Sequence, residues 1–432
     1  MEKIKYLNKT KNGKGGLTIQ KKKVLTFLTI ALLTIAAFYA GYTIASPSNT
    51  FTISNGVYPG AASYTVWRDG NYYYAKNAYG AIDYSGTDAA SVIQSAINAC
   101  PNGSSIFIKS GEYEIKSEIL ITKPLTITGE HAATERYQSL YQVVWGVKMS
   151  VMTLGITAFH IQCDEAVIIE NIIIFYKVIN YAQPSSGIGI LIEGTNSTNW
   201  NKQSIFRNLR IVSFWKGIYS KAGSAWVVDN CYIALNYYGV YLENIAYGDA
   251  GDNTIVNSVI SGNMSWGYLV YQTSSGGLRI ENSKLLYGSY GIYLSINSAT
   301  SNLIVVGNSI ENQITQAIHL DSSVLFFNVL ITDNQFGGLG GGGKYIQISS
   351  SYIEGVNIAN NVFRGTSGTS GTYGVYIGSG TSILISGNRF DYQYYAVYNY
   401  GGTQITVHGN VFKACTNSIS GTVDSADNYS YS

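Results

Sequence analysis

The sequence has 432 residues, of which 46% are hydrophobic and only 12% are charged. It is long enough to bury a large core, and its charged fraction is about half that of an ordinary soluble protein. Its 47 glycines and 37 tyrosines suit a β-rich protein, and they exclude a helical bundle, which would need more Ala, Leu, Glu and Lys. A formal net charge of +2 does not favour a nucleic-acid partner.

The N-terminus combines a basic segment with a long apolar one. Residues 1–23 contain eight lysines and one acid, whereas residues 24–45 contain no charged side chain. An apolar stretch of roughly 20 residues spans a bilayer as a helix, and flanking lysines stay in the cytoplasm. We therefore expect a Lys-rich cytoplasmic segment (1–23) and a transmembrane anchor (24–45), with the rest of the chain outside the cell. A cleaved signal peptide is the alternative, and the protein would then be secreted.

The next segments lead into a β-rich region that we expect to extend over residues 82–432. Residues 46–81 are rich in Tyr, Gly and Asn and are interpreted as a lead-in segment, either an extra strand or a stalk. Asp88 is a good N-cap for an amphipathic helix over residues 89–100. Such a helix would cover the open end of the first β coil, which otherwise exposes an unpaired strand edge.

An internal repeat dominates the second half of the chain. Segments of the form apolar-x-apolar-x-x-Asn-x-apolar recur every 22–37 residues, with their asparagines at Asn171, Asn208, Asn230, Asn257, Asn282, Asn308, Asn334, Asn361, Asn388 and Asn410. A second alternating stretch, which opens with Gly or Ala, follows in the same repeats. Short strands with no helix between them predict a parallel solenoid in which each coil pairs with the next. We expect Asn282, Asn308 and Asn334 to stack, buried and paired, at one corner, because Asn tolerates the left-handed backbone of a sharp turn.

The start of this region resembles a known superfamily. The segments TDAASVIQSAINAC (87–100), NGSSIFIKSGEYEI (102–115) and LTITGE (125–130) follow one another. Their order resembles the N-terminal signature of the pectin-lyase-like right-handed parallel β-helix superfamily. Together with the Asn repeat, the resemblance covers about residues 82–425. It implies an all-β fold, a single-stranded right-handed parallel β-helix with an N-terminal capping helix, here preceded by one transmembrane helix.

The resemblance also implies that substrates lie along the outer face of one sheet. We assign the Gly/Ala-led stretches to that sheet, with the residue after the Gly pointing inward. The outward row is then Tyr219, Tyr241, either Leu269 or Tyr271, Tyr293, His319, Gln347, Tyr376 and Tyr398. Tyrosines at this pitch can stack on sugar rings and offer hydroxyls to them, so we predict that this row binds polysaccharide. Ala at Tyr241, Tyr293 and Tyr376 should then remove binding with little change in melting temperature. Alternatively, Tyr only suits an exposed β face.

The next outward row contains acidic side chains. It holds Glu193, Lys221, Glu243, Tyr271, Ser295 and Asp321, and a loop with Asp249 and Asp252 follows Glu243. Two glutamates two coils apart are about 9.6 Å apart, near the upper limit for the carboxylates of an inverting glycosidase. If the chain is an enzyme, Glu193, Lys221, Glu243, Asp249 and Asp252 are the catalytic candidates. The alternative is a solvated Glu–Lys–Glu cluster.

The remaining signals leave the function open. Catalytic motifs of polygalacturonases are absent, and WVVDNCYI (226–233) is similar to a pectate-lyase stretch but has Asn230 where that family has His. Four scattered cysteines favour buried thiols, with one or two disulfides as the alternative. We predict no metal site and no cofactor. Three functions remain: a glycan-binding β-helix, a polysaccharide lyase or hydrolase with unusual residues, and a structural surface protein or adhesin that could form homo-oligomers.

Overall fold

The computed structural model describes residues 62–131, 146–177, 183–194, 203–221, 223–243, 251–273, 276–297, 302–366 and 371–431. The expected cytoplasmic segment and the apolar segment 24–45 lie outside these residues. Among the described residues, none belongs to a helix long and apolar enough to cross a membrane.

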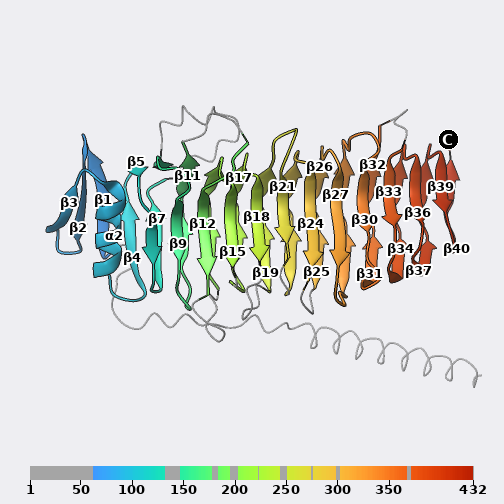
Figure 1. The fold of residues 1–432 in the computed structure, drawn as a ribbon, viewed down its shortest axis with the longest axis horizontal. Helices are drawn as coiled ribbons and strands as arrows, with labels where there is room; N and C mark the ends of the chain where they lie inside the picture. The colour runs from blue at the N-terminus through green and yellow to red at the C-terminus, as the bar shows by residue number, and fades with distance from the viewer. Residues whose placement is uncertain are drawn as a thin grey trace, which may run out of the picture. The chain divides into compact units, whose positions relative to one another are not determined.

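Sheet A is a 16-stranded sheet that runs the whole length of the described β region (Figure 1). Its strands, in spatial order, are β3 (Ile82–Gly86), β2 (Tyr72–Asn77), β1 (Tyr64–Asp69), β4 (Ser104–Ile108), β7 (Leu125–Gly129), β10 (Ile168–Glu170), β13 (Ile205–Arg207), β16 (Val227–Asp229), β19 (Asn253–Val256), β22 (Leu278–Glu281), β25 (Leu303–Val306), β28 (Val329–Thr332), β31 (Glu354–Ala359), β34 (Thr381–Ser386), β37 (Thr403–His408) and β40 (Asp424–Ala426).

Sheets B and C contain 13 and 12 strands. Sheet B consists of β5 (Gly111–Ile115), β8 (Val147–Val151), β11 (Ile172–Tyr176), β14 (Arg210–Val212), β17 (Tyr232–Ala234), β20 (Val259–Ser261), β23 (Lys284–Leu286), β26 (Ser309–Glu311), β29 (Gln335–Gly337), β32 (Val362–Arg364), β35 (Arg389–Asp391), β38 (Val411–Lys413) and β41 (Tyr429–Tyr431). Sheet C consists of β6 (Ile119–Ile121), β9 (Thr157–Ile161), β12 (Ile188–Glu193), β15 (Lys216–Lys221), β18 (Tyr238–Glu243), β21 (Tyr268–Gln272), β24 (Tyr290–Ile296), β27 (Gln316–Ser322), β30 (Lys344–Ile348), β33 (Tyr373–Ile377), β36 (Tyr395–Asn399) and β39 (Asn417–Ser420).

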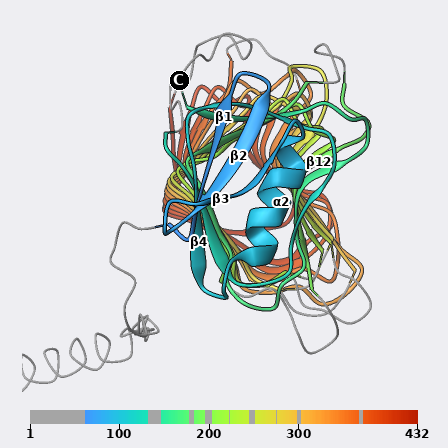
Figure 2. The same ribbon diagram turned by 90° about the vertical axis from the view of Figure 1, so that its left-hand side faces the viewer.

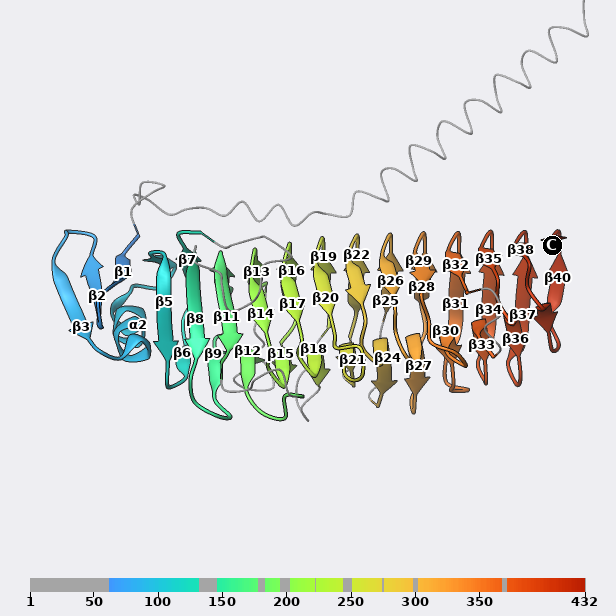
Figure 3. The same cartoon turned by 90° about the horizontal axis from the view of Figure 1, so that it is seen from above.

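From β4 to β39, each coil contributes one strand to each sheet, so successive strands in this part of the chain lie in different sheets. Strands β10, β11 and β12, for example, follow one another in sequence and belong to sheets A, B and C. From β4 onward, all the ladders between coils are parallel, as the pairing of β12 with β9 and β15 illustrates. This arrangement confirms the predicted parallel solenoid, and the strands of sheet C follow one another along one of its sides (Figure 3).

Apolar columns fill the inside of the coils. In sheet A, one in-register column is completely buried and consists of Ile127, Ile169, Phe206, Val228, Ile255, Ile280, Val305, Ile331, Ile358, Ile385 and Val407. These residues are the alternating Ile and Val of the repeat, whose period of two places them on one face of each strand. Sheet B adds the stacked rings of Phe336, Phe363 and Phe390 inside the later coils.

Helix α2 (Ala89–Ala99) closes the N-terminal end of the coils, as predicted (Figure 2). The backbone N–H of Ser91 donates to the Asp88 carboxylate at 3.1 Å, so Asp88 is the N-cap, and Cys100 ends the helix. Residues 64–77 supply β1 and β2, which pair antiparallel with each other, while β1 pairs in parallel with β4. This part of the lead-in segment is therefore a strand pair of sheet A, the first of the two alternatives.

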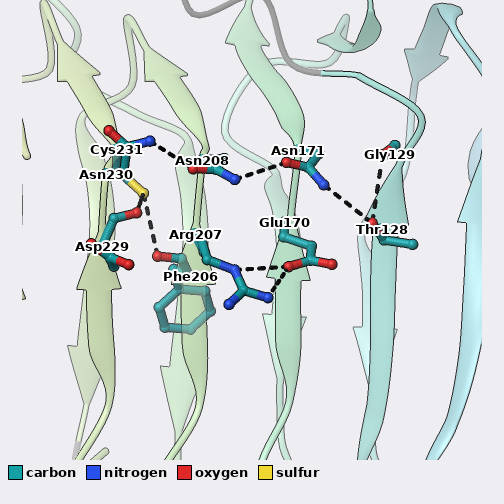
Figure 4. Close-up of polar contacts among 10 residues, drawn as sticks. All are labelled: Thr128, Gly129, Glu170, Asn171, Phe206, Arg207, Asn208, Asp229, Asn230 and Cys231. Atoms are coloured by element: carbon teal, nitrogen blue, oxygen red, sulfur yellow. Dashed lines mark hydrogen bonds and ion pairs between the residues drawn. The ribbon is translucent and has the colours of Figure 1, made fainter. Parts of the chain in front are cut away.

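The corner between sheets A and B carries two asparagine ladders, not one. Asn171, Asn208, Asn230, Asn257 and Asn282 have φ between 48° and 60°, the left-handed conformation. Within this group, Asn208 donates to Asn171 at 3.0 Å and Asn230 donates to Asn208 at 2.8 Å (Figure 4). These five side chains form an outer ladder, which is hydrogen-bonded directly from Asn171 to Asn230, whereas Asn257 donates to the Asp229 carboxylate at 3.1 Å.

The second ladder lies one residue further along the chain and is buried. It consists of Asn308, Asn334, Asn361, Asn388 and Asn410, each of which donates both its backbone N–H and its side-chain amide to the next Asn. Because Glu281 pairs with Val306, Gly307 takes the place of Asn282, and Asn308 takes the place of Ser283. The expectation that Asn282 stacks with Asn308 and Asn334 is therefore wrong, and Gly307, not Asn308, supplies the left-handed residue of its coil.

Candidate functional site

The outer face of sheet C carries the row of side chains predicted from the sequence. We call it the second row, and in register it contains Leu191, Tyr219, Tyr241, Tyr271, Tyr293, His319, Gln347, Tyr376, Tyr398 and Ser420. The sequence left either Leu269 or Tyr271 for one place in this row. Tyr271 occupies it, since Leu269 is buried with 2% of its surface exposed. The residue after each Gly, such as Val240 or Ile292, is completely buried and points inward as expected.

A parallel row of tyrosines was not predicted. This first row contains Lys216, Tyr238, Tyr268, Tyr290, Gln316, Lys344, Tyr373, Tyr395 and Asn417. Simple alternation would put residues three apart on opposite faces, yet the rings of Tyr238 and Tyr241 lie 5.0 Å apart on one face. Gly239, one of the two residues between them, forms no ladder pair, and a Cβ there would lie 2.5 Å from the carbonyl oxygen of Leu269. This irregularity shifts the alternation by one residue.

The tyrosine rings stack on one another along each row, except that Tyr241 and Tyr271 meet with 60° between their ring planes. Tyr268 stacks on Tyr290 at 4.8 Å with 5° between the ring planes, and Tyr219 stacks on Tyr241 at 5.2 Å with 9°. The C-terminal coils repeat the arrangement with Tyr373 and Tyr395, at 5.2 Å and 11°. Because neighbouring rings cover these faces, the aromatic faces are not open to a sugar ring, contrary to the stacking mode expected from the sequence. Ring edges and hydroxyl groups remain for contact with a ligand.

Burial among neighbouring rings keeps the phenols of Tyr238 and Tyr241 protonated. Burial is the largest cause and nearby tyrosines add to it, so that the pKa of Tyr238 is raised to about 12. Burial and the Glu243 carboxylate raise the pKa of Tyr241 to about 12 as well. These two hydroxyls therefore stay neutral and can both donate and accept hydrogen bonds.

The third row brings together three of the predicted catalytic residues. Glu193, Lys221 and Glu243 lie in register on β12, β15 and β18. The Lys221 ammonium donates to Glu193 at 2.7 Å, and the hydroxyl of Tyr219 donates to Glu243. Ser295 and Asp321 pair further along the row, as predicted. Tyr271 belongs to the second row, so Thr273, which follows Gln272 opposite Leu242, takes its place in the third row.

His160 and Glu118 extend this charged group toward the N-terminus, and sequence reasoning missed both. The Nε2 atom of His160 lies 3.0 Å from Glu193, and its Nδ1 atom lies 2.9 Å from Glu118. His160 occupies the second row beside Leu191. The signal was present, because Ala158–Ile161 repeats the Ala-apolar-His-apolar pattern of Ala317–Leu320.

The contacts of Glu193 determine its charge. Partial burial acts to raise the pKa of Glu193, but hydrogen bonds and charges from Lys221 and His160 outweigh it and lower the pKa. Glu193 is therefore an ionised carboxylate held between two basic groups. It is poorly suited to act as the protonated acid of a hydrolase, which would need a raised pKa.

Lys216 lies under the tyrosines at the N-terminal end of the first row. Its ammonium is 3.3 Å from the ring centroid of Tyr219, 4.2 Å from Tyr241 and 4.6 Å from Trp215. Only 5% of its surface is exposed. Burial is the main cause that lowers the pKa of Lys216 to about 8. The rings stabilise this cation and also keep it from solvent.

His319 lies in a network of neutral polar groups. Its Nδ1 atom is 2.7 Å from the side-chain amide oxygen of Gln316, and the hydroxyl of Ser349 is 3.1 Å from its Nε2 atom. The amide oxygen can only accept, so Nδ1 carries the hydrogen and Nε2 accepts from Ser349. Burial lowers the pKa of His319 to about 4, which matches this neutral form.

The two aspartates are not placed with the third row by the structure. Asp252 directly precedes β19, a strand in the middle of sheet A, and its φ is 59°. Asp249 lies outside the described residues. Cys100, Cys231 and Cys415 are free thiols, and Cys163 is buried.

Comparison with known sequences identifies the architecture. The family described as the right-handed beta helix region matches residues 149–310 and 188–354. Residues 149–354 of this chain therefore form a right-handed parallel β-helix. No curated protein matches its sequence.

Several solved β-helix structures are similar to this chain. The Dettilon tailspike protein is 16% identical with a TM-score of 0.54, over 79% of this chain and 65% of its own. The DFA-IIIase of Arthrobacter chlorophenolicus without its lid is 14% identical with a TM-score of 0.56, over 78% of this chain and 95% of its own. PfbA, a surface adhesin of Streptococcus pneumoniae, is 12% identical with a TM-score of 0.50, over 79% of this chain and 88% of its own. At these identities the likeness shows the fold alone, and this chain spans less than two thirds of the tailspike.

Proposed function

We propose that this β-helix is a polysaccharide-binding protein of the cell surface and that glycan binds along the outer face of sheet C. The observation that carries the proposal is the pair of in-register tyrosine rows. Six tyrosines on β18, β21 and β24 occupy both rows in three successive coils. Tyrosine combines a large rigid ring with a hydroxyl, which suits repeated contacts to a long ligand.

The pitch of the coils supports an extended ligand. Neighbouring strands lie about 4.8 Å apart, so the rows offer a hydroxyl at each short step along the β-helix axis. The rows resume with Tyr373, Tyr376, Tyr395 and Tyr398 on β33 and β36. A polymer of repeating units is the ligand class that can use such a repeating surface.

Two of the similar structures are named as a tailspike and a surface adhesin. Those names agree with a role in contact at a surface. For this chain we propose the corresponding position, with residues 24–45 as a membrane anchor and the β-helix outside the cell. This part of the proposal is supported by the sequence of the N-terminal segment.

A glycan array with the full chain tests the proposal. Purified protein should bind one or more polysaccharides, and Tyr271→Ala with Tyr293→Ala should abolish that binding. Tyr352, which is 52% exposed in the turn before β31, provides the matched control, because Tyr352→Ala should bind as the parent does. Each variant is first checked for folding by circular dichroism. A folded double variant that binds normally would contradict the proposed face.

Catalysis by the third row is our second proposal. The observation in its favour is the register of Glu193, Lys221 and Glu243, with Tyr219 bonded to Glu243. Since Glu193 is held ionised by Lys221 and His160, Glu243 is the better candidate to donate or accept a proton. Reducing-end and unsaturated-product assays on a polysaccharide panel test this proposal, and activity that survives Glu243→Gln would exclude it.

A further inference from the structure

We infer that the ligand of the tyrosine rows is an uncharged polysaccharide, recognised through its hydroxyl groups at a central patch on β18, β21 and β24. The central patch consists of Tyr238, Tyr241, Tyr268, Tyr271, Tyr290 and Tyr293. The inference rests on the proposed function and specifies the chemistry of the same face.

Stacking within the central patch leaves only hydroxyls and ring edges for binding. Tyr238 stacks on Tyr268 at 5.3 Å with 17° between the planes, and Tyr271 stacks on Tyr293 at 5.4 Å with 19°. Between the rows, Tyr290 and Tyr293 meet edge to face at 5.0 Å. Each ring is thus fixed by neighbours on its strand and on the next coil. The rings that carry the hydroxyls are already held in place before ligand binds. Binding therefore loses little side-chain conformational entropy.

The hydroxyl groups of this array are available. Within the described ranges, the hydroxyls of Tyr238, Tyr268, Tyr271, Tyr290 and Tyr293 make no hydrogen bond to protein, and all five side chains are partly exposed. A phenol hydroxyl donates one hydrogen bond and accepts others, and a sugar hydroxyl does the same. The two groups are therefore complementary partners, and neither needs a charge.

The charged groups nearest to the central patch are already occupied. Glu243 accepts from Tyr219, and Lys221 is paired with Glu193. Asp321, whose charge acts on Tyr293, accepts from the backbone N–H of Ser322. Lys216 lies beneath the rings of Tyr219 and Tyr241 and is 5% exposed. A carboxylated or sulfated glycan would need exposed cations at regular spacing, and both rows are uncharged from β18 to β24. A neutral glycan meets no such requirement.

Substitution of tyrosine by phenylalanine distinguishes binding through the hydroxyl groups from binding through the aromatic rings. Tyr268→Phe with Tyr290→Phe keeps the stacked rings and removes two hydroxyls from the centre of the patch. We expect at least about a tenfold loss of affinity for neutral glycans, because each lost hydrogen bond is worth roughly threefold to tenfold. Tyr79→Phe is the control, since Tyr79 is 97% exposed on the β2–β3 turn and should bind normally.

The measurement compares neutral with anionic polysaccharides by affinity electrophoresis of the full chain. Dextran, mannan and levan represent the neutral class, and polygalacturonate, alginate and hyaluronate represent the anionic class. We expect binding to a neutral glycan with an affinity that changes less than about twofold between about 0.05 and 0.5 M salt. Binding only to anionic glycans, or full affinity in the double Phe variant, would overturn the inference. The proposed function would still stand if the Tyr→Ala variants lose binding. Absence of binding to every glycan would overturn both.

Discussion

Tyr268 and Tyr290 lie face to face on neighbouring strands of sheet C, with ring centroids 4.8 Å apart and ring planes 5° apart. Tyr238 and Tyr268 continue the stack at 5.3 Å. The tyrosines of the two rows are therefore partners of one another before they are partners of any ligand. Their contribution to stability has to be separated from their contribution to binding.

Replacing Tyr290 by Ala should destabilise the β-helix. The substitution removes a stacked and an edge-to-face contact and exposes part of Tyr268, so we expect a loss of about 1–3 kcal/mol in the free energy of unfolding. Tyr290→Phe should cost less than about 1 kcal/mol, because the ring contacts remain. Denaturant unfolding followed by tyrosine fluorescence measures both. This result would correct the expectation that tyrosines of this face can be truncated without effect on melting temperature.

The buried asparagine ladder should be more sensitive to substitution than the outer one. Asn308 accepts from the backbone of Ser283 and donates to Ile280, Val306 and Asn334, so Asn308→Leu leaves several buried groups unpaired. We expect a loss of about 1–3 kcal/mol. Asn282→Gly is the contrast and should change stability by less than about 1 kcal/mol, because Gly tolerates the left-handed backbone that Gly307 adopts in the next coil. Equal effects of the two changes in chemical denaturation would mean that the two ladders are not distinct.

His319 should make stability depend on pH in the acidic range. Burial lowers its pKa to about 4 in the folded protein, against an ordinary value of 6.5 for histidine, so the unfolded chain binds more protons between these values. Stability from this residue is therefore complete above about pH 6.5 and is lost as the pH falls to about 4, by at most about 3 kcal/mol. His319→Gln should flatten that part of the pH profile in thermal unfolding. An unchanged slope would show that His319 is not held neutral by Gln316 and Ser349.

The proposed membrane anchor predicts a protease-protected N-terminus. Protease added to intact cells should remove the β-helix and leave the Lys-rich residues 1–23 with the membrane, detected by an N-terminal tag. A mature protein that starts near Ser46 and is released into the medium would instead indicate the cleaved signal peptide.

The sequence was sufficient to predict the solenoid, its capping helix and the second row, because each depends on a local pattern. Alternating Ile and Val mark the buried columns, and Asp88 marks the start of α2. The first row was not predicted, because the unpaired Gly239 and its equivalents shift the alternation of inward and outward side chains by one residue. The sequence predicted one asparagine ladder instead of two for a related reason. Asn282 and Asn308 occupy adjacent positions at the corner, and this one-residue difference is visible only from the pairing of Glu281 with Val306.

The charged group of the candidate site was only partly predictable. Glu193, Lys221 and Glu243 follow from strand register, whereas the bridge from His160 to Glu193 joins residues 33 apart in the sequence. The aromatic rings around the Lys216 ammonium, those of Trp215, Tyr219 and Tyr241, come from two coils. Contacts between coils of this kind need the register of the whole stack, which the repeat determines only approximately because its intervals vary.

A crystal structure of the protein with the oligosaccharide that binds best in the glycan panel would locate the binding face directly. We predict sugar along the outer face of sheet C, with its hydroxyl groups within hydrogen-bond distance of the hydroxyls of Tyr268, Tyr271 and Tyr290. Sugar bound at another surface, with the tyrosine rows of sheet C unoccupied, would show that these rows are not the glycan-binding face.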